Sequence, residues 1–367
     1  MPLSKIQGID GQVTSNLGRR NLIINGAMQV WQRATAATTA VNNYQSVDRF
    51  RTNIGGAGVY TTERSTDSPF GSGFSLKAQV TTADTSIAGG DYAYLHQDIE
   101  GQNLQHLLYG NSSAKTITLS FWVKSNKTGT YTVVFRKLSN TSYHLVHEYT
   151  IDAANTWEKK VITISPTAGS TSFLTASAGA IVNSNVRGLQ IGFNLTFGST
   201  YNGATNNTWT TNTSHYATTN QVNWLDDTSN NFYLTEVQLE LGDTATPFEH
   251  RLFGEELSLC QRYYIQYENS TGSGNQAFLP GMITGNRAYV PFGFPNEMRV
   301  APSASYGTAA FRVISASSSQ TNVNPDEFFT PSNKNGRFRF PTGSHTNGQA
   351  CYIAMDDGAA VKLDSEM

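Results

Sequence analysis

The sequence has few of the residues and motifs that mark disulfide-rich, membrane-spanning or nucleic-acid-binding proteins. Its 367 residues include two cysteines, Cys260 and Cys351, which are too few for a disulfide framework and are expected to be buried free thiols. Charged residues make up 14% of the chain and the formal net charge is −2, so we expect no nucleic-acid partner. No segment approaches the roughly 18 apolar residues of a membrane span, and the N-terminus has no apolar signal-peptide core. These absences predict a protein that is made in a cytoplasm and released by a route other than secretion.

The sequence also offers no pattern that is typical of a catalytic or metal site. The two histidines of YHLVHEYT (143–150) are three apart, and this spacing places them on opposite faces of a strand. Glu236 and Glu240 resemble the solvent face of a strand, and Asp226 and Asp227 lack a calcium-loop signature, although calcium binding there stays an alternative. The chain contains no GxSxG, GxxxxGK[ST] or HExxH motif. We therefore expect a protein that is not an enzyme, with no metal site and no cofactor.

Many short β-strands are favoured by the residues that are abundant. The 17 Tyr, 19 Phe and 32 Gly residues are typical of strands joined by tight turns. Apolar residues alternate clearly over residues 74–81, which indicates a half-buried strand. Residues 126–129 predict a hairpin turn that joins the strands on either side. The other strand-like segments before residue 245 are 47–52, 58–64, 92–99, 116–125, 130–137, 143–150, 157–164, 188–197 and 232–241.

The last third of the chain predicts one helix and a second set of strands. Apolar residues at Phe253, Leu257, Cys260 and Tyr264 form a helical stripe, so we expect a helix over 254–264 with this stripe buried. A weaker helix is expected at 104–109. Strand signals then resume at 278–284, 287–292, 304–308, 310–316, 336–340 and 350–355. The predicted protein is all-β, with an N-terminal docking arm (1–19), a jelly-roll-like β-sandwich (20–250), a linking helix (251–268) and a smaller C-terminal β domain (269–367).

Residues 198–224 are the most distinctive segment. They are nearly free of charge, rich in Asn and Thr, and contain four aromatic residues: Tyr201, Trp209, Tyr216 and Trp224. Aromatic faces stack on sugar rings, while amides and hydroxyls pair with sugar hydroxyls. These four residues are therefore candidate ligand-binding residues. The alternative is a long polar loop whose aromatic side chains anchor it to the sandwich.

Several segments resemble a module of tailed-bacteriophage virion proteins. RNLIINGAMQVWQR (20–33) with VDRF (47–50) resembles its opening, and FYLTEVQLELGDTATPFEHRLFGEELSLCQRYY (232–264) resembles its close. LSFWVKS and NTWTTNTSHYATTNQVNW lie between them, and FGFPNEMRVAPSASY and CYIAMD resemble the domain that usually follows. Members of this family are tail-fibre, receptor-binding or unassigned structural proteins, and their sandwich is similar to carbohydrate-binding modules.

The resemblance implies a location in the virion, in the tail, and a short tail fibre or appendage that takes part in attachment to a glycan of the host surface. The alternatives are a head, collar or neck decoration with an architectural role, or a depolymerase. Because phage appendages of this kind are commonly trimeric, the resemblance also implies a homo-oligomer, namely a trimer. The candidate interface residues are Phe328, Phe329, Phe338 and Phe340. The alternative is that these four side chains pack in the core of their own domain. About 20 residues precede the module, and their Leu3, Lys5, Ile6 and Ile9 are expected to dock on another virion protein, with a frayed terminus as the alternative.

Overall fold

The computed structural model describes residues 19–269, 276–307, 311–343 and 345–367. The chain divides into two compact units at the bond between Leu252 and Phe253. We call residues 19–252 the sandwich unit and residues 253–367 the C-terminal unit, and each is described by itself. The Leu3, Lys5, Ile6 and Ile9 residues of the predicted docking arm lie outside the described residues.

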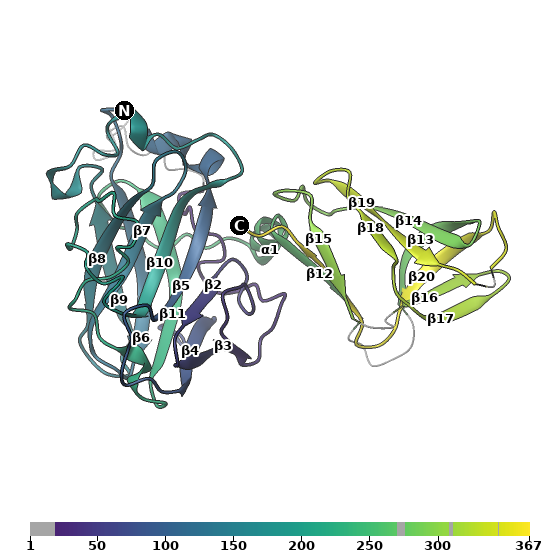
Figure 1. Ribbon diagram of the computed structural model, residues 1–367, viewed down its shortest axis with the longest axis horizontal. Helices are drawn as coiled ribbons and strands as arrows, with labels where there is room; N and C mark the ends of the chain where they lie inside the picture. The colour runs from purple at the N-terminus through teal and green to yellow at the C-terminus, as the bar shows by residue number, and fades with distance from the viewer. Residues whose placement is uncertain (1–18, 270–275, 308–310, 344) are drawn as a thin grey trace, which may run out of the picture. The chain divides into compact units, whose positions relative to one another are not determined.

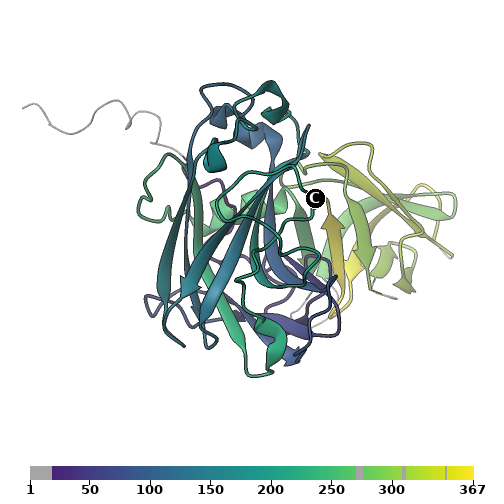
Figure 2. The ribbon, with the colours of Figure 1, turned by 60° about the vertical axis from the view of Figure 1, so that its left-hand side comes forward.

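The sandwich unit consists of two antiparallel sheets that form two layers (Figures 1 and 2). The six-stranded sheet has the order β1-β3-β4-β11-β6-β9, with β1 Thr38–Thr39, β3 Val59–Ser65, β4 Ser75–Thr82, β11 Asn231–Leu241, β6 Ile117–Ser125 and β9 Glu158–Ile164. The five-stranded sheet has the order β2-β5-β10-β7-β8, with β2 Arg51–Gly55, β5 Tyr92–Glu100, β10 Arg187–Phe197, β7 Gly129–Lys137 and β8 Tyr143–Ile151. Short 3-10 helices lie at Gly101–Leu107, Ala168–Ser170, Ser177–Gly179 and Trp224–Asp226. The unit is thus a jelly-roll-like β-sandwich, and the all-β prediction is confirmed.

Alternation along the strands decides which side chains enter the core. On β6 the inward residues include Leu119 and Phe121, and on β10 they include Ile191 and Phe193, all with no exposed surface. Burying a side chain of this size contributes about 1.5–3 kcal/mol. Because successive residues point to opposite faces, the residues between them lie on the outer faces of the sheets, where a ligand can approach.

The predicted hairpin at residues 126–129 is wrong. β6 pairs with β11 and β9 in one sheet, whereas β7 pairs with β10 and β8 in the other. The connection between Ser125 and Gly129 therefore crosses from one layer to the opposite one. A short glycine-containing loop can reverse the chain within one sheet or between two sheets. The loop sequence therefore does not indicate whether the strand after it pairs with the strand before it or joins the other sheet.

The two ends of the sandwich unit are held together by hydrogen bonds. The Asn21 carboxamide donates to the Val237 carbonyl at 3.0 Å and accepts from the Leu239 amide at 3.1 Å. The Glu249 carboxylate accepts from the Asn21 amide at 2.8 Å, and the Val237 amide donates to the Gly26 carbonyl at 3.0 Å. We call residues 20–30 and 237–251 the clasp. It joins parts of the two segments that carry the resemblance to the phage module.

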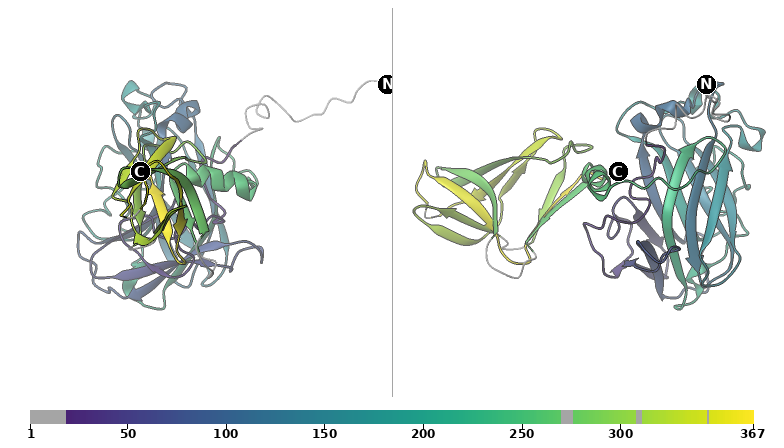
Figure 3. Two further views of the ribbon diagram at one scale, coloured as in Figure 1. Left: turned by 90° about the vertical axis from the view of Figure 1, so that its right-hand side faces the viewer. Right: turned by 180° about the vertical axis from the view of Figure 1, so that it is seen from behind.

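The C-terminal unit begins with the helix α1, Phe253–Gln261, and continues with two antiparallel sheets (Figure 3). The three-stranded sheet β12-β21-β15 contains β12 Tyr264–Glu268, β21 Ala360–Asp364 and β15 Ser303–Tyr306. The seven-stranded sheet β17-β16-β20-β13-β14-β19-β18 contains β17 Ser319–Val323, β16 Phe311–Ser315, β20 Ala350–Met355, β13 Gln276–Thr284, β14 Arg287–Gly293, β19 Asn335–Pro341 and β18 Glu327–Phe329. Ile265 and Leu363 of the smaller sheet share one core with Ile283 and Ile353 of the larger sheet.

The helix is shorter than predicted and its apolar stripe is only partly buried. It ends at Gln261, and Tyr264, the last residue of the predicted stripe, begins strand β12. Phe253 is 57% exposed and Leu257 is half-buried, while Cys260 is buried and forms no disulfide with a described residue. The expectation that the whole stripe is buried is therefore wrong at Phe253 and Leu257, whereas Cys260 and Tyr264 are buried. Cys351 is a buried thiol, as expected.

Two of the four predicted interface aromatics belong to the core of the C-terminal unit. Phe338 and Phe340 are two apart on β19, so they share one face of the strand, and each is 1% exposed. They cannot contact a second chain while the unit is folded. Phe328 packs partly against the same core, and Phe329 is 49% exposed. Phe329 alone of these four has the exposure that an interface residue needs.

Candidate functional site

The outer face of the five-stranded sheet carries a row of aromatic residues on β5 and β10. The two strands are antiparallel, with Asn194 opposite Tyr94 and Phe197 opposite Tyr92. A shift of the pairing between Asn194 and Thr196 marks a bulge in β10. A bulge changes which face the following residues occupy, and here it brings Phe197 to the side of Tyr92 and Tyr94.

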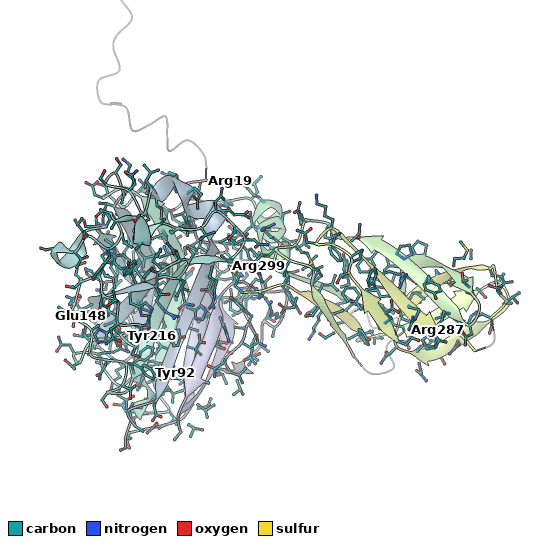
Figure 4. The ribbon with its side chains drawn as sticks, turned by 45° about the horizontal axis from the view of Figure 1, so that its top comes forward. Arg19, Tyr92, Glu148, Tyr216, Arg287 and Arg299 are labelled. Carbon is teal, nitrogen blue, oxygen red and sulfur yellow. The ribbon has the colours of Figure 1, made fainter. Side chains whose placement is uncertain are left out.

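Residues Tyr201 and Tyr216 of the segment 198–224 complete this row, and we call the five rings the tyrosine cluster. Tyr216 lies 5.2 Å from Phe197 and 5.8 Å from Tyr94, while Tyr201 lies 6.1 Å from Tyr92 and 5.8 Å from Tyr216, measured between ring centroids. The five residues line a depression of about 200 Å³. Tyr92, Tyr201 and Tyr216 are partly exposed there, so aromatic surface is available to a ligand. Figure 4 labels Tyr92 and Tyr216 on this face of the sandwich unit.

Hydrogen bonds fix the segment 198–224 in place over the sheet. The Tyr216 amide donates to the Tyr201 carbonyl at 2.9 Å, and the Asn194 side chain donates to the Tyr216 carbonyl at 2.6 Å. Farther along, the Val222 amide donates to the Thr130 carbonyl of β7 at 2.9 Å. The two tyrosines of this segment are therefore positioned on the sheet before any ligand arrives.

The two predicted tryptophans do not belong to the tyrosine cluster. Trp209 is 1% exposed and Trp224 has no exposed surface, and both rings lie in the core of the sandwich unit. Their indole N–H groups donate to the carbonyls of Ser165 at 2.9 Å and Asn231 at 3.1 Å. A ring without an exposed face cannot stack on a sugar, so these two residues anchor the segment, as the alternative interpretation stated. Of the four candidates, the structure brings together only Tyr201 and Tyr216.

A buried polar network lies beside the tyrosine cluster on the same face. The Gln190 side chain donates to Asp98 Oδ1 at 2.8 Å and accepts from the Arg136 guanidinium. Asn53 Nδ2 donates to His96 Nδ1 at 2.8 Å. His96 Nε2 and Asp98 Oδ2 are buried 3.5 Å apart, and neither has a hydrogen-bond partner among the described residues. This network links β2, β5, β10 and β7 below the aromatic rings.

Two histidines of this face, His144 and His96, are uncharged at neutral pH. The Arg136 guanidinium donates to His144 Nε2 at 3.1 Å and lies 4.8 Å from the centre of the Tyr216 ring. Burial, followed by the charge of Arg136, lowers the pKa of His144 to about 4. Burial also lowers the pKa of His96. The rings therefore serve as hydrogen-bonding groups at neutral pH and not as proton carriers.

The acidic residues named from the sequence are placed elsewhere. Asp226 forms an ion pair with Lys127 at 2.6 Å and accepts from the Asn230 side chain at 2.8 Å. Asp227 accepts from the Ser229 amide at 2.8 Å. Within residues 19–269, 276–307, 311–343 and 345–367, no group of three or more His, Cys, Asp or Glu side chains is arranged for a metal ion. In the same residues no helix is long and apolar enough to span a membrane.

Sequence reasoning missed Tyr92, Tyr94 and Phe197. The spacing of Tyr92 and Tyr94 indicates that both lie on one face of a strand, but the sequence contains no sign of whether that face is the core or the surface. The position of Phe197 depends on the bulge in β10, which has no sequence signature here. The sequence offered one indication of these residues, which is that β5, like residues 198–224, is rich in aromatic residues.

Comparison with protein-family models and with curated proteins gives no match. Among solved structures, the enzymatically active domain of tailspike protein 4 from bacteriophage CBA120 is 14% identical with a TM-score of 0.29, and the match covers 60% of this chain and 21% of that chain. A family 11 carbohydrate-binding module from Clostridium thermocellum, in complex with a β-1,3-1,4-mixed-linked tetrasaccharide, is 13% identical with a TM-score of 0.30, over 59% of this chain and 99% of that chain.

A third match is to the CBM22-1 and GH10 modules of an N-terminal endo-1,4-β-D-xylanase from Clostridium thermocellum, complexed with xylohexaose. It is 13% identical with a TM-score of 0.28, over 57% of this chain and 29% of that chain. The chain therefore spans less than a third of the tailspike and xylanase structures that it matches. At these identities and TM-scores the matches say nothing about the ligand of this chain, and the candidate site stands on its own side chains.

Proposed function

We propose that the sandwich unit binds a carbohydrate of the bacterial surface through the tyrosine cluster, and that the chain is a structural protein of a tailed-phage virion, a short tail fibre or appendage. The observation that carries the binding proposal is the open depression in which Tyr92, Tyr201 and Tyr216 present aromatic surface. The phage role is supported by the resemblance of residues 20–33 and 232–264 to a virion module.

The chemistry of the depression suits a sugar. Ring faces accept the C–H side of a pyranose, and phenolic hydroxyls pair with sugar hydroxyls. The volume of about 200 Å³ lies below the roughly 300–1,000 Å³ of drug-sized ligand pockets, so we expect one or two sugar residues and weak binding per chain. Several chains on one particle raise such weak binding by avidity, which can reach about 10²–10⁴-fold.

A glycan array tests the binding proposal. The full-length protein is applied to arrayed bacterial surface oligosaccharides, and a sugar that binds is then titrated against the variants Tyr92→Ala and Tyr201→Ala. Removing a ring that contacts a ligand costs about 1–2 kcal/mol, or roughly 5–30-fold in affinity. Tyr201→Phe, which keeps the ring and loses the hydroxyl, separates stacking from hydrogen bonding.

Tyr352→Ala is the matched control, because Tyr352 is an exposed tyrosine of the C-terminal unit. It is expected to bind like the wild type. Equal losses in Tyr352→Ala and Tyr201→Ala, or no loss in either cluster variant, would contradict a site at the tyrosine cluster. We further propose that binding is not followed by cleavage, so incubation with the bound glycan should release no new reducing ends.

The position in the particle needs a separate experiment. Antibodies against the C-terminal unit, imaged on intact particles, are expected to label the tail. Label confined to the head, collar or neck would support the architectural role instead. Neither outcome depends on whether the tyrosine cluster binds sugar.

A further inference from the structure

A second and larger pocket lies on the outer face of the six-stranded sheet, on the opposite side of the sandwich from the tyrosine cluster. Its volume is about 740 Å³, within the range of ligand pockets. One wall comes from strands β6, β9 and β11, and the others come from residues 68–74, from Ala27 and Gln29, and from residues 247–250. This sheet comes forward in the right panel of Figure 3.

A strained β-bulge directs a carboxylate into this pocket. Trp122 on β6 pairs with Thr235 on β11, and the pairing then skips to Gln238. Glu236 has a φ of 49°, a left-handed conformation that favours glycine. Because Val237 is buried in the core and Thr235 faces outward, the bulge keeps the Glu236 side chain out of the core. Backbone strain of this kind persists where the surrounding structure holds it and is frequent at binding sites.

Four polar side chains line the pocket without a hydrogen-bond partner among the described residues. No hydrogen bond or ion pair joins the side chains of Gln29, Lys159, Glu236 or His250 to any described residue, and all four line the pocket. Burial raises the pKa of Glu236, while the neighbouring His250 and Lys159 favour its ionised form. Polar groups that converge on a pocket and stay unpaired are free to bond to a ligand.

Aromatic side chains form the apolar part of the pocket. Phe70 is 59% exposed and contacts Trp122 edge to face, with ring centroids 5.4 Å apart. Phe248 also lines the pocket and contacts His250, at 5.0 Å between ring centroids. An exposed phenylalanine beside a half-buried tryptophan is a large apolar surface for a monomer to leave in water, and it matches the C–H face of a sugar ring.

We propose that this pocket is a second carbohydrate-binding site, for an uncharged oligosaccharide that stacks on Trp122 and bonds to Glu236. The charges select against other small ligands. The Lys159 ammonium opposes a cation, and the Glu236 carboxylate opposes an anion. Carboxylate and amide oxygens accept from sugar hydroxyls, and Lys159 donates to them. The proposal uses only residues of the six-stranded sheet and its neighbours, so it does not depend on the tyrosine cluster.

The test uses the full chain in the Tyr201→Ala background, in which the tyrosine cluster is impaired. Neutral oligosaccharides of glucose, galactose, mannose and N-acetylglucosamine are screened by saturation-transfer NMR, and one that binds is titrated. We expect Glu236→Gly or Trp122→Ala to weaken this binding at least tenfold. Glycine adopts the φ of residue 236 without strain, so Glu236→Gly should fold, and its melting temperature verifies this. Glu236→Gln keeps an acceptor oxygen and should retain part of the affinity.

The matched control is Glu63→Gln, because Glu63 lies on the same sheet outside the pocket and pairs with Lys77. It should bind like its parent. Binding that survives Glu236→Gly, or a Tyr201→Ala protein that binds none of these sugars, would overturn the second site. Binding that is lost in Tyr201→Ala but unchanged by Glu236→Gly supports the tyrosine cluster alone, and the reverse pattern supports the second site alone, so the two proposals fail separately.

Discussion

The substitution Gly26→Ala tests the clasp that closes the sandwich unit. A Cβ atom at position 26 would lie 2.1 Å from the Val237 carbonyl oxygen and 3.1 Å from its carbonyl carbon. The obstacle is backbone, so no side-chain rotation relieves it. The two segments of the clasp must separate, and this breaks the hydrogen bond from the Val237 amide to the Gly26 carbonyl.

The expected loss follows from these two effects. Forcing an extra carbon into a packed site costs about 1–3 kcal/mol. Leaving buried backbone groups without their partner costs about 1–3 kcal/mol more. We therefore expect the free energy of unfolding to fall by about 3 kcal/mol, which for a unit of this size lowers the melting temperature by roughly 6–12 °C.

Tryptophan fluorescence is the appropriate assay, because the five tryptophans of the chain all belong to the sandwich unit: Trp31, Trp122, Trp157, Trp209 and Trp224. Gly90→Ala is the matched control, since a Cβ there meets nothing within 4 Å and its φ is ordinary. Gly90→Ala should melt within about 2 °C of the wild type. A Gly26→Ala protein that melts equally close to the wild type would refute the close approach of the two segments.

Two further predictions concern the loop and the sheet beneath it. Trp224→Ala should lower the free energy of unfolding by about 3–5 kcal/mol, as for other buried aromatic residues. Tyr201→Ala should change it by less than about 2 kcal/mol. Similar losses in both variants would mean that Tyr201 also anchors the loop. The pKa of His144 is about 4 in the folded protein and 6.5 without burial, so the unfolded chain binds more protons between these values and stability falls as the pH falls from about 6.5 to 4. With about 1.4 kcal/mol for each pKa unit, His144 accounts for up to about 3 kcal/mol of this fall, and melting curves of His144→Gln between pH 4 and 7 should show a correspondingly weaker dependence.

The positions of most strands were predictable because aromatic, β-branched and other apolar residues gather in them and turn residues separate them. The segments 92–99 and 143–150 appear as Tyr92–Glu100 and Tyr143–Ile151. The strands Ser319–Val323 and Glu327–Phe329 of the C-terminal unit were missed, since SQTNV and EFF carry too little alternation to mark a strand. They form by pairing with stronger neighbours, which is information that a local segment does not contain.

The surface of the sheets was less predictable than their strands. The sequence places Glu236 and Glu240 together on a solvent face, yet Glu240 is buried and accepts from the Thr246 amide at 2.9 Å. Both side chains lie on the outer face, since Val237 and Leu239 enter the core, but the segment around Thr246 folds over Glu240 and covers it. A strand's own alternation does not indicate which part of its outer face another segment covers. In the same way, the tyrosines at 201 and 216 resemble the tryptophans at 209 and 224 in sequence. Only the tertiary fold distinguishes a ring that anchors the loop from a ring that faces solvent.

The two proposed sites differ in how a glycan would engage them. The two sites lie on the outer faces of the two sheets, which pack about 10 Å apart. Both sheets and the core between them therefore separate the sites. One short oligosaccharide cannot reach around the edge of the sandwich to fill both sites. Joint occupancy therefore requires either a long polymer that wraps the edge or separate glycan chains on the two sides. A dense polysaccharide layer supplies both, so each site can be filled by a glycan on its own side, and the two weak contacts together hold the sandwich unit more firmly than either contact alone.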